Sequence, residues 1–278
     1  MRQPERRVEQ RRPRGIPLRA VVPNAVTALA LCSGLTGIRY AIAAFQSGDP
    51  GDWERALAFV VIAAVLDGMD GRIARMLNGQ SRFGAELDSL SDVIAFGVSP
   101  AIIIYLWSLQ NFPRFGWIFA LAHAVCAALR LARFNAQIDV EEQPHKSAGF
   151  LTGVPAPAGA GLALLPIYLW LWTGFEELRL TWLVAPWTAL VAFLMISNLA
   201  TFSWTSFRLR RHVRLWVLVV IALIGGALFS APWPTLSVFA LLYALSIPFS
   251  MSSYAKVRRQ RAAAAAHAPA PAADAPQP

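Results

Sequence analysis

The sequence has little charge for its length and almost no cysteine. Only 15% of its 278 residues are charged, whereas 56% are hydrophobic and the mean hydropathy is +0.47. This composition excludes a soluble globular class and is typical of a polytopic membrane protein. The two cysteines, Cys32 and Cys126, both lie in apolar runs. They indicate buried small side chains and exclude a disulfide framework.

Acidic residues are also scarce. The chain has 16 acidic and 25 basic residues, which gives a net charge of +9. An excess of this kind occurs in nucleic-acid-binding proteins, but here the basic residues cluster beside apolar segments. That placement is typical of membrane orientation and of attraction to anionic lipids. We therefore expect membrane lipids as partners and no nucleic acid.

Eight apolar stretches each have about the twenty residues that a membrane-spanning helix requires. They cover residues 24–45, 55–77, 86–109, 115–134, 155–173, 181–203, 213–230 and 235–253. We expect an all-α integral membrane protein, a polytopic helical bundle of about eight transmembrane helices. Its three predicted parts are a basic cytoplasmic arm (1–20), a membrane domain (21–254) and a tail (255–278) that is basic, then disordered and rich in Ala and Pro.

Positive charge falls on one side of these stretches when the N-terminus is placed in the cytoplasm. The connections on that side and the tail contain Arg82, Lys146, Arg208, Arg210, Arg211, Lys256, Arg258, Arg259 and Arg261. The opposite connections contain Asp49, Asp52, Arg114, Glu176, Glu177 and Arg179. The positive-inside rule therefore predicts that both termini are cytoplasmic and that the number of spans is even.

Charge is concentrated in one stretch, DGMDGRIARMLNGQSRFGAELDSLSD, which contains the carboxylates Asp67, Asp70, Asp88 and Asp92. The first two are three residues apart and the last two are four apart, so each pair projects from one face of a helix. Two unit charges about 4 Å apart repel by roughly 4 kcal/mol at an effective dielectric of about 20. Divalent cations remove that penalty. Because the ligands are oxygens, with no His or Cys nearby, we expect Mg, Mn or Ca rather than Zn.

The spacing in this stretch resembles the signature of the CDP-alcohol phosphotransferase family. The residues that carry the resemblance are Asp67, Asp70, Gly71, Ala74, Arg75, Gly84, Asp88 and Asp92. Eight residues separate Arg75 from Gly84. Three residues separate Gly84 from Asp88, and three more separate Asp88 from Asp92. The resemblance implies a six-helix membrane core, to which this chain adds two helices, and a homodimer.

Two further segments resemble the bacterial integral-membrane phosphatidylserine synthases of this family. They are ALRLARFN at 128–135 and GFLTGVPAPAGAG at 149–161. The resemblance implies transfer of the phosphatidyl group from CDP-diacylglycerol to the hydroxyl of L-serine, which gives phosphatidylserine and CMP. It also implies two divalent cations per site, Mg or Mn, and a multi-pass protein of the cell inner membrane with a cytoplasmic active site.

The resemblance also implies roles for particular residues. The metal ligands would be Asp67, Asp70, Asp88 and Asp92, and Asp92 would also be catalytic, taking the proton of the acceptor hydroxyl. The nucleotide and the CDP-lipid would contact Asn24, Thr27, Asp67, Gly71, Ala74, Arg75, Ser81 and Gly84. Asn24 and Thr27 equally fit an ordinary helix start. Ala30 departs from many phosphatidylserine synthases, which have a second Asn there.

Arg130 and Arg133 lie three residues apart on one helical face, and we expect at least one of them within the depth of the membrane, where an unpaired cation is costly. Their counter-anion is a motif aspartate, a lipid phosphate or the carboxylate of an amino-acid acceptor, and interfacial anchoring is the alternative. A carboxylate distinguishes serine from ethanolamine and choline. We therefore predict a contact of this pair with the acceptor or with a lipid phosphate.

Two other functions stay open from the sequence. One keeps the chemistry and changes the acceptor to choline, glycerol 3-phosphate or inositol phosphate. The other is a membrane transporter with an acidic ion site, which would have internal repeats and acids on several helices. The sequence shows neither feature. A purely structural scaffold leaves the acidic stretch unexplained.

Overall fold

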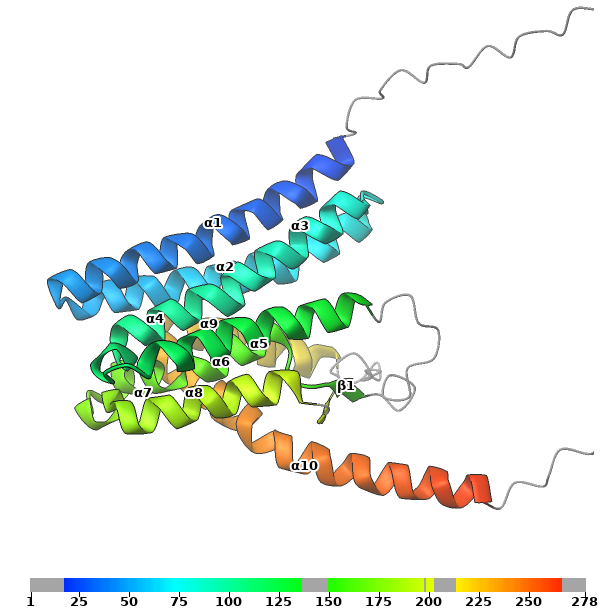
Figure 1. Ribbon diagram of the computed structural model, residues 1–278. Coiled ribbons are helices and arrows are strands. Elements are labelled where there is room, and N and C mark those ends of the chain that lie inside the picture. The colour runs from blue at the N-terminus through cyan, green and yellow to red at the C-terminus, as the bar shows by residue number, and fades with distance from the viewer. Residues whose placement is uncertain (1–17, 137–149, 198, 203–213, 267–278) are drawn as a thin grey trace, which may run out of the picture.

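The computed structural model describes residues 18–136, 150–197, 199–202 and 214–266, which form a bundle of helices (Figure 1). The predicted cytoplasmic arm lies outside the described residues up to residue 17, and so does the end of the predicted tail from residue 267. The loop that contains Lys146 and the connection that contains Arg208, Arg210 and Arg211 also lie outside them.

The first part of the chain contains α1 (Leu18–Ser47), α2 (Pro50–Met76), α3 (Arg82–Asp92), the π-helix η1 (Val93–Val98), α4 (Ser99–Trp107), η2 (Leu109–Asn111) and α5 (Gly116–Ala136). The second part contains β1 (Phe150–Thr152), α6 (Ala156–Ala163), α7 (Leu165–Thr173), η4 (Glu176–Arg179), α8 (Thr181–Ile196), β2 (Ala200–Phe202), α9 (Arg214–Ser230) and α10 (Pro232–Ala266). The strands β1 and β2 form a short antiparallel pair in an otherwise helical fold. The predicted all-α membrane class is confirmed.

The predicted number of eight spans is not confirmed, although each predicted stretch contains a helix. Among the described residues, four helical segments are long and apolar enough to cross a membrane: Val21–Ser47, Arg82–Trp107, Gly116–Ala136 and Pro232–Ser250. The pair α6 and α7, bent by 42°, makes a fifth if it is one span. Charged residues reduce the hydropathy of α2, whereas α8 and α9 have only 16 and 17 residues. The protein is a multi-pass membrane protein.

The start of α1 and the end of α10 lie at the same end of the bundle, and the α2–α3 connection lies there too (Figure 1). An even number of crossings produces this arrangement. The helix α10 continues to Ala266, past residue 254, where the membrane domain was predicted to end. This extension runs through an alanine-rich segment, and alanine has the highest helix propensity.

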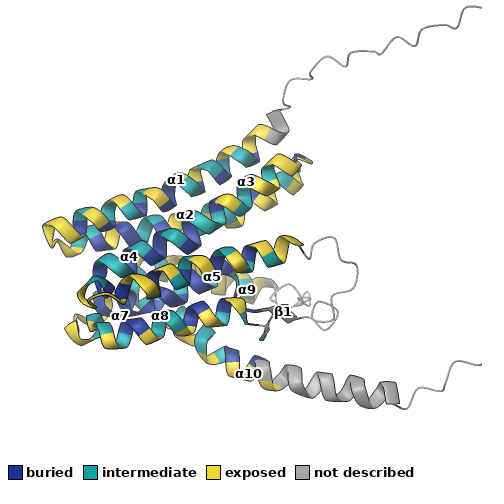
Figure 2. Cartoon of the chain, in the orientation of Figure 1, coloured by how far each residue is buried: buried dark blue, intermediate teal, exposed yellow. Residues whose placement is uncertain are grey.

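The apolar core lies where α4 to α8 face one another and extends to buried residues of α1 and α2, whereas the outer faces of the helices are exposed (Figure 2). Trp107 is fully buried and packs edge-on against Trp170, with 5.9 Å between the ring centroids. Large apolar side chains such as Leu29, Val125 and Leu190 are exposed on the outside. Such outward-facing side chains suit a lipid environment, because lipid tails are as apolar as leucine.

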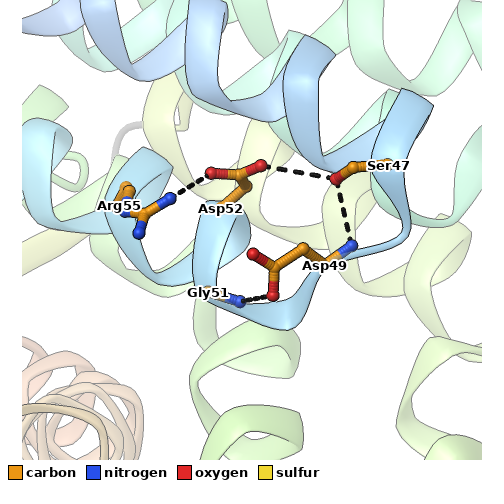
Figure 3. Close-up of polar contacts among 5 residues, drawn as sticks. All are labelled: Ser47, Asp49, Gly51, Asp52 and Arg55. Carbon is orange, nitrogen blue, oxygen red and sulfur yellow. Dashed lines mark hydrogen bonds and ion pairs between the residues drawn. The ribbon is translucent and has the colours of Figure 1, made fainter.

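A small polar cluster fixes the turn between α1 and α2 (Figure 3). The side chain of Asp49 caps α2 by accepting a hydrogen bond of 2.9 Å from the Gly51 N–H. The Ser47 hydroxyl accepts from the Asp49 N–H and donates to Asp52, which forms an ion pair of 2.6 Å with Arg55. The turn packs α2 along α1, so the acidic half of α2 returns to the end of the bundle where α1 begins.

We predict that Asp49→Ala destabilises the hairpin of α1 and α2. The variant loses a helix cap worth about 1 kcal/mol, so its unfolding midpoint in detergent should fall by about 2–4 °C. The matched control is Glu54→Ala, which removes the same charge from an exposed position in α2. Equal midpoints for the two variants would contradict the capping role.

Candidate active site

Helices α2 and α3 bring three of the four aspartates together. One carboxylate oxygen from each of Asp67, Asp70 and Asp88 lies within 4.8 Å of the other two. Oxygens on opposite sides of a bound Mg²⁺ are about 4.2 Å apart, and around Ca²⁺ they are about 5 Å apart. The three aspartates can therefore bind one divalent cation with little movement.

Asp92 lies beside this group of three. Its side chain interacts directly with that of Asp67. Its Oδ1 atom is buried and has no hydrogen-bond partner among the described residues. A buried carboxylate oxygen without a donor is costly, and a cation stabilises it. The donor set, which consists only of oxygens, therefore fits a divalent metal ion.

The helix α1 orients one of these aspartates. Asp70 is the most buried of the four, with 6% of its surface exposed. Thr27 of α1 donates a hydrogen bond of 2.6 Å from Oγ1 to Asp70 Oδ2. Ser91 of α3 donates from its hydroxyl to the backbone carbonyl of Thr27 at 3.3 Å. Three helices are therefore linked at Thr27, for which the sequence predicted a nucleotide contact or an ordinary helix start.

A cavity of about 400 Å³ opens beside the aspartates, between the start of α1, the end of α2 and the start of α3. Its lining includes Asn24, Thr27, Gly71, Ala74, Arg75, Ser81 and Gly84, which are all the predicted nucleotide contacts except Asp67. Asp70 and Asp88 also line it. Sequence reasoning missed Pro23, Gly79, Gln80 and Ala85, and the only signal for them was their position beside Asn24, Ser81 and Gly84.

The two motif glycines have different surroundings. A Cβ atom at Gly71 would meet nothing within 4 Å, so this position leaves the cavity open. A Cβ atom at Gly84 would lie 2.7 Å from Asn24 Oδ1 and 3.1 Å from Ser81 Oγ, so these two side chains would have to shift. Ser81 caps α3 by accepting a hydrogen bond from the Gly84 N–H. Gly84 therefore leaves room for the side chains of Asn24 and Ser81 at the start of α3.

Arg75 lies at the edge of the cavity. Its Nε atom donates a hydrogen bond of 3.1 Å to the backbone carbonyl of Gly71 one turn earlier. This bond holds the guanidinium group beside the cavity. An arginine so placed can bind an anionic group such as a phosphate.

The two arginines of α5 have different surroundings. Arg133 donates from Nη1 to the carbonyl of Ile196 at 3.0 Å and from Nη2 to that of Ser197 at 3.3 Å. Both carbonyls lie at the end of α8, where the last carbonyls of a helix have no donor within the helix. Arg130 is half-buried and lies within electrostatic range of Asp92, and its Nε has no hydrogen-bond partner among the described residues. Arg130 therefore lies near the aspartates, and Arg133 contacts the end of α8.

The sequence model of the CDP-alcohol phosphatidyltransferase family matches residues 20–196, which include all four aspartates and the cavity. The chain belongs to this family. The predicted membership is confirmed, and the match ends at α8, so α9 and α10 of this CDP-alcohol phosphatidyltransferase lie outside it.

Curated relatives of this phosphatidyltransferase share a more specific name. A CDP-diacylglycerol–serine O-phosphatidyltransferase of Mycobacterium bovis is 36% identical over 240 residues, which cover 86% of this chain and 81% of the relative. A Helicobacter pylori protein of the same name is 36% identical over 229 residues, which cover 80% of this chain and 87% of the relative. A Methanocaldococcus jannaschii protein of that name is 37% identical over 146 residues, or 52% of this chain and 62% of the relative.

We predict that Asp88→Asn lowers the affinity of this phosphatidyltransferase for Mn²⁺ by about tenfold or more, because one of three converging ligands is neutralised. Electron paramagnetic resonance of free Mn²⁺ in titrations of the purified protein measures the affinity. Glu86→Gln is the matched control, since it neutralises an exposed carboxylate on the same helix outside the group of three. Wild-type affinity in the Asp88 variant would show that the metal binds elsewhere.

Proposed function

We propose that this chain transfers the phosphatidyl group of CDP-diacylglycerol to the hydroxyl of L-serine, with phosphatidylserine and CMP as products. The observation that carries the proposal is the convergence of Asp67, Asp70 and Asp88 beside the cavity at the start of α3. The name shared by relatives that match most of the chain supports serine as the acceptor.

The cavity is the proposed site of the cytidine diphosphate head group. Its volume of about 400 Å³ lies in the usual range for small-molecule sites. Arg75 would bind the phosphates, whereas Asn24 at the start of α1 would contact the nucleoside. The opening left at Gly71 allows the head group to approach the backbone of α2 closely. The two acyl chains remain in the bilayer.

The proposed metal ligands are the four aspartates. Asp67, Asp70 and Asp88 would hold two divalent cations, Mg or Mn, and Asp92 would be shared between the second cation and the acceptor. When bound, such ions neutralise negative charge on the pyrophosphate and make CMP a better leaving group.

The proposed reaction is one displacement at phosphorus. The serine hydroxyl oxygen attacks the phosphorus atom that carries diacylglycerol, and the bond from this phosphorus to the bridging oxygen breaks. CMP leaves with the bridging oxygen. Asp92 accepts the hydroxyl proton. Its position beside Asp67 and its Oδ1 atom without a hydrogen-bond partner among the described residues support this role. Arg130 binds the serine carboxylate, while Arg133 keeps α5 against the end of α8.

The alternatives are not favoured. Choline has no carboxylate for Arg130, and the relatives bear the name of a serine transferase. Membership of a phosphatidyltransferase family argues against a transporter. We further propose that the protein is a homodimer of the cell inner membrane, with both termini and the cavity in the cytoplasm. The shared location of the two described chain ends and the α2–α3 connection supports this topology.

The direct test is CMP release from CDP-diacylglycerol by the purified full-length protein with Mn²⁺. Serine, choline, glycerol 3-phosphate and inositol phosphate are supplied in separate reactions, and we expect release with serine alone. Release with another acceptor would refute serine and leave the family chemistry intact. The absence of release with all four acceptors would refute the proposed function.

We predict that Asp92→Asn abolishes serine-dependent CMP release without unfolding the protein, because an amide cannot accept the hydroxyl proton. The readouts are turnover and the unfolding midpoint in detergent. Glu86→Gln again serves as the control for loss of one negative charge on α3. Near-normal turnover in the Asp92 variant would contradict the role of this carboxylate.

A further inference from the structure

The helix does not continue regularly after Asp92. Residues Val93–Val98 form a π-helix, in which the Ser99 N–H bonds to the carbonyl of Ile94, five residues earlier. π-Helical turns are rare and occur frequently at functional sites. Pro100 follows, and it has no N–H to donate to the carbonyl four residues before it, that of Phe96. A side-chain donor from a neighbouring helix can compensate for such a loss.

His123 of α5 provides such a donor. Its Nε2 atom lies 3.3 Å from the carbonyl oxygen of Phe96, and its side chain is completely buried. Because a carbonyl can only accept, the bond requires hydrogen on Nε2. Nδ1 is buried and has no hydrogen-bond partner among the described residues. These surroundings favour the neutral imidazole with hydrogen on Nε2 alone.

The same face of α5 contacts the π-helical turn at other points. His123, Ala127 and Arg130 follow at intervals of four and three residues and so share one face. A Cβ atom at Gly97 would lie only 3.0 Å from Cβ of Ala127, so the two helices are in close contact there. Arg130 lies near Asp92. The position of Asp92 relative to Arg130 therefore depends on how the π-helical turn packs against α5.

We propose that His123 is a positioning residue, whose Nε2–H bond to the Phe96 carbonyl fixes the π-helical turn and with it the distance between Asp92 and Arg130. His123 does not line the cavity of the proposed head-group site, so it has no direct contact with the nucleotide. The inference rests on the proposed roles of Asp92 and Arg130 in the transfer to serine. It adds His123, which itself takes no part in the reaction, to the residues on which the proposed transfer depends.

The test compares two replacements of His123 in the purified full-length protein. In His123→Gln the side-chain amide can still donate to the carbonyl, whereas His123→Leu fills similar space without a donor. We expect His123→Leu to lower kcat by about tenfold to 100-fold, as small displacements of catalytic groups do. Its KM for CDP-diacylglycerol should stay within about twofold, and His123→Gln should regain kcat to within about threefold of the wild type.

Thr188→Val is the matched control for loss of a buried hydrogen bond. The Thr188 hydroxyl is also fully buried and donates to a backbone carbonyl, that of Val184 in its own helix. We expect this variant to keep wild-type kcat, whatever its unfolding midpoint. Wild-type kcat in His123→Leu would overturn the inference, and so would equal losses of kcat in the leucine and glutamine variants.

A second measurement does not depend on activity or on the folding of a variant. In ¹⁵N spectra of the histidine-labelled wild-type protein, His123 should show a protonated Nε2 and an unprotonated Nδ1. The signal is assigned by its loss in His123→Gln. A hydrogen on Nδ1 alone would overturn the inference. If the wild type releases no CMP with serine, the proposed function fails; if the wild type is active and His123→Leu matches it, only the positioning role fails.

Discussion

The repulsion among carboxylates held between α2 and α3 is the constraint on which the rest of this structure depends. At an effective dielectric of about 20, each pair at about 4 Å costs roughly 4 kcal/mol, and the membrane adds to the cost of charge. Several features keep the groups together nevertheless. Thr27 donates to Asp70, the turn at Asp49 packs α2 along α1, and Ser91 of α3 donates to the Thr27 carbonyl of α1. The arrangement is suited to divalent cations, which remove the repulsion.

Two arginines lie near the aspartates in different surroundings. Arg75 lies at the edge of the cavity between α1, α2 and α3. Arg130 of α5 does not line this cavity, and it lies within electrostatic range of Asp92. In the proposed transfer, Arg75 would bind the phosphates of the nucleotide and Arg130 the carboxylate of the acceptor. A direct displacement needs the attacking and leaving oxygens on opposite sides of the phosphorus.

Within a membrane, each break in a helix leaves backbone groups that water cannot satisfy. The π-helical turn after Asp92 is such a break, and Pro100 removes a further donor. The bond from His123 shows how a neighbouring helix can compensate. A side chain also satisfies backbone groups at the end of α8, where Arg133 donates to the carbonyls of Ile196 and Ser197. Polar side chains of α5 therefore satisfy the backbone of two other elements.

The sequence by itself determined the helical membrane class, the family and the faces on which the aspartates lie, because hydropathy and residue spacing are local properties of the chain. It also indicated most of the cavity lining through the motif around Gly71 and Gly84. Only the tertiary structure showed that Arg130 lies near Asp92 and that Arg133 donates to the end of α8, since the two arginines share one face of α5 and their partners lie far away in the chain. The π-helical turn and its bond to His123 could likewise not be predicted from the sequence, because both depend on contacts between residues far apart in the chain.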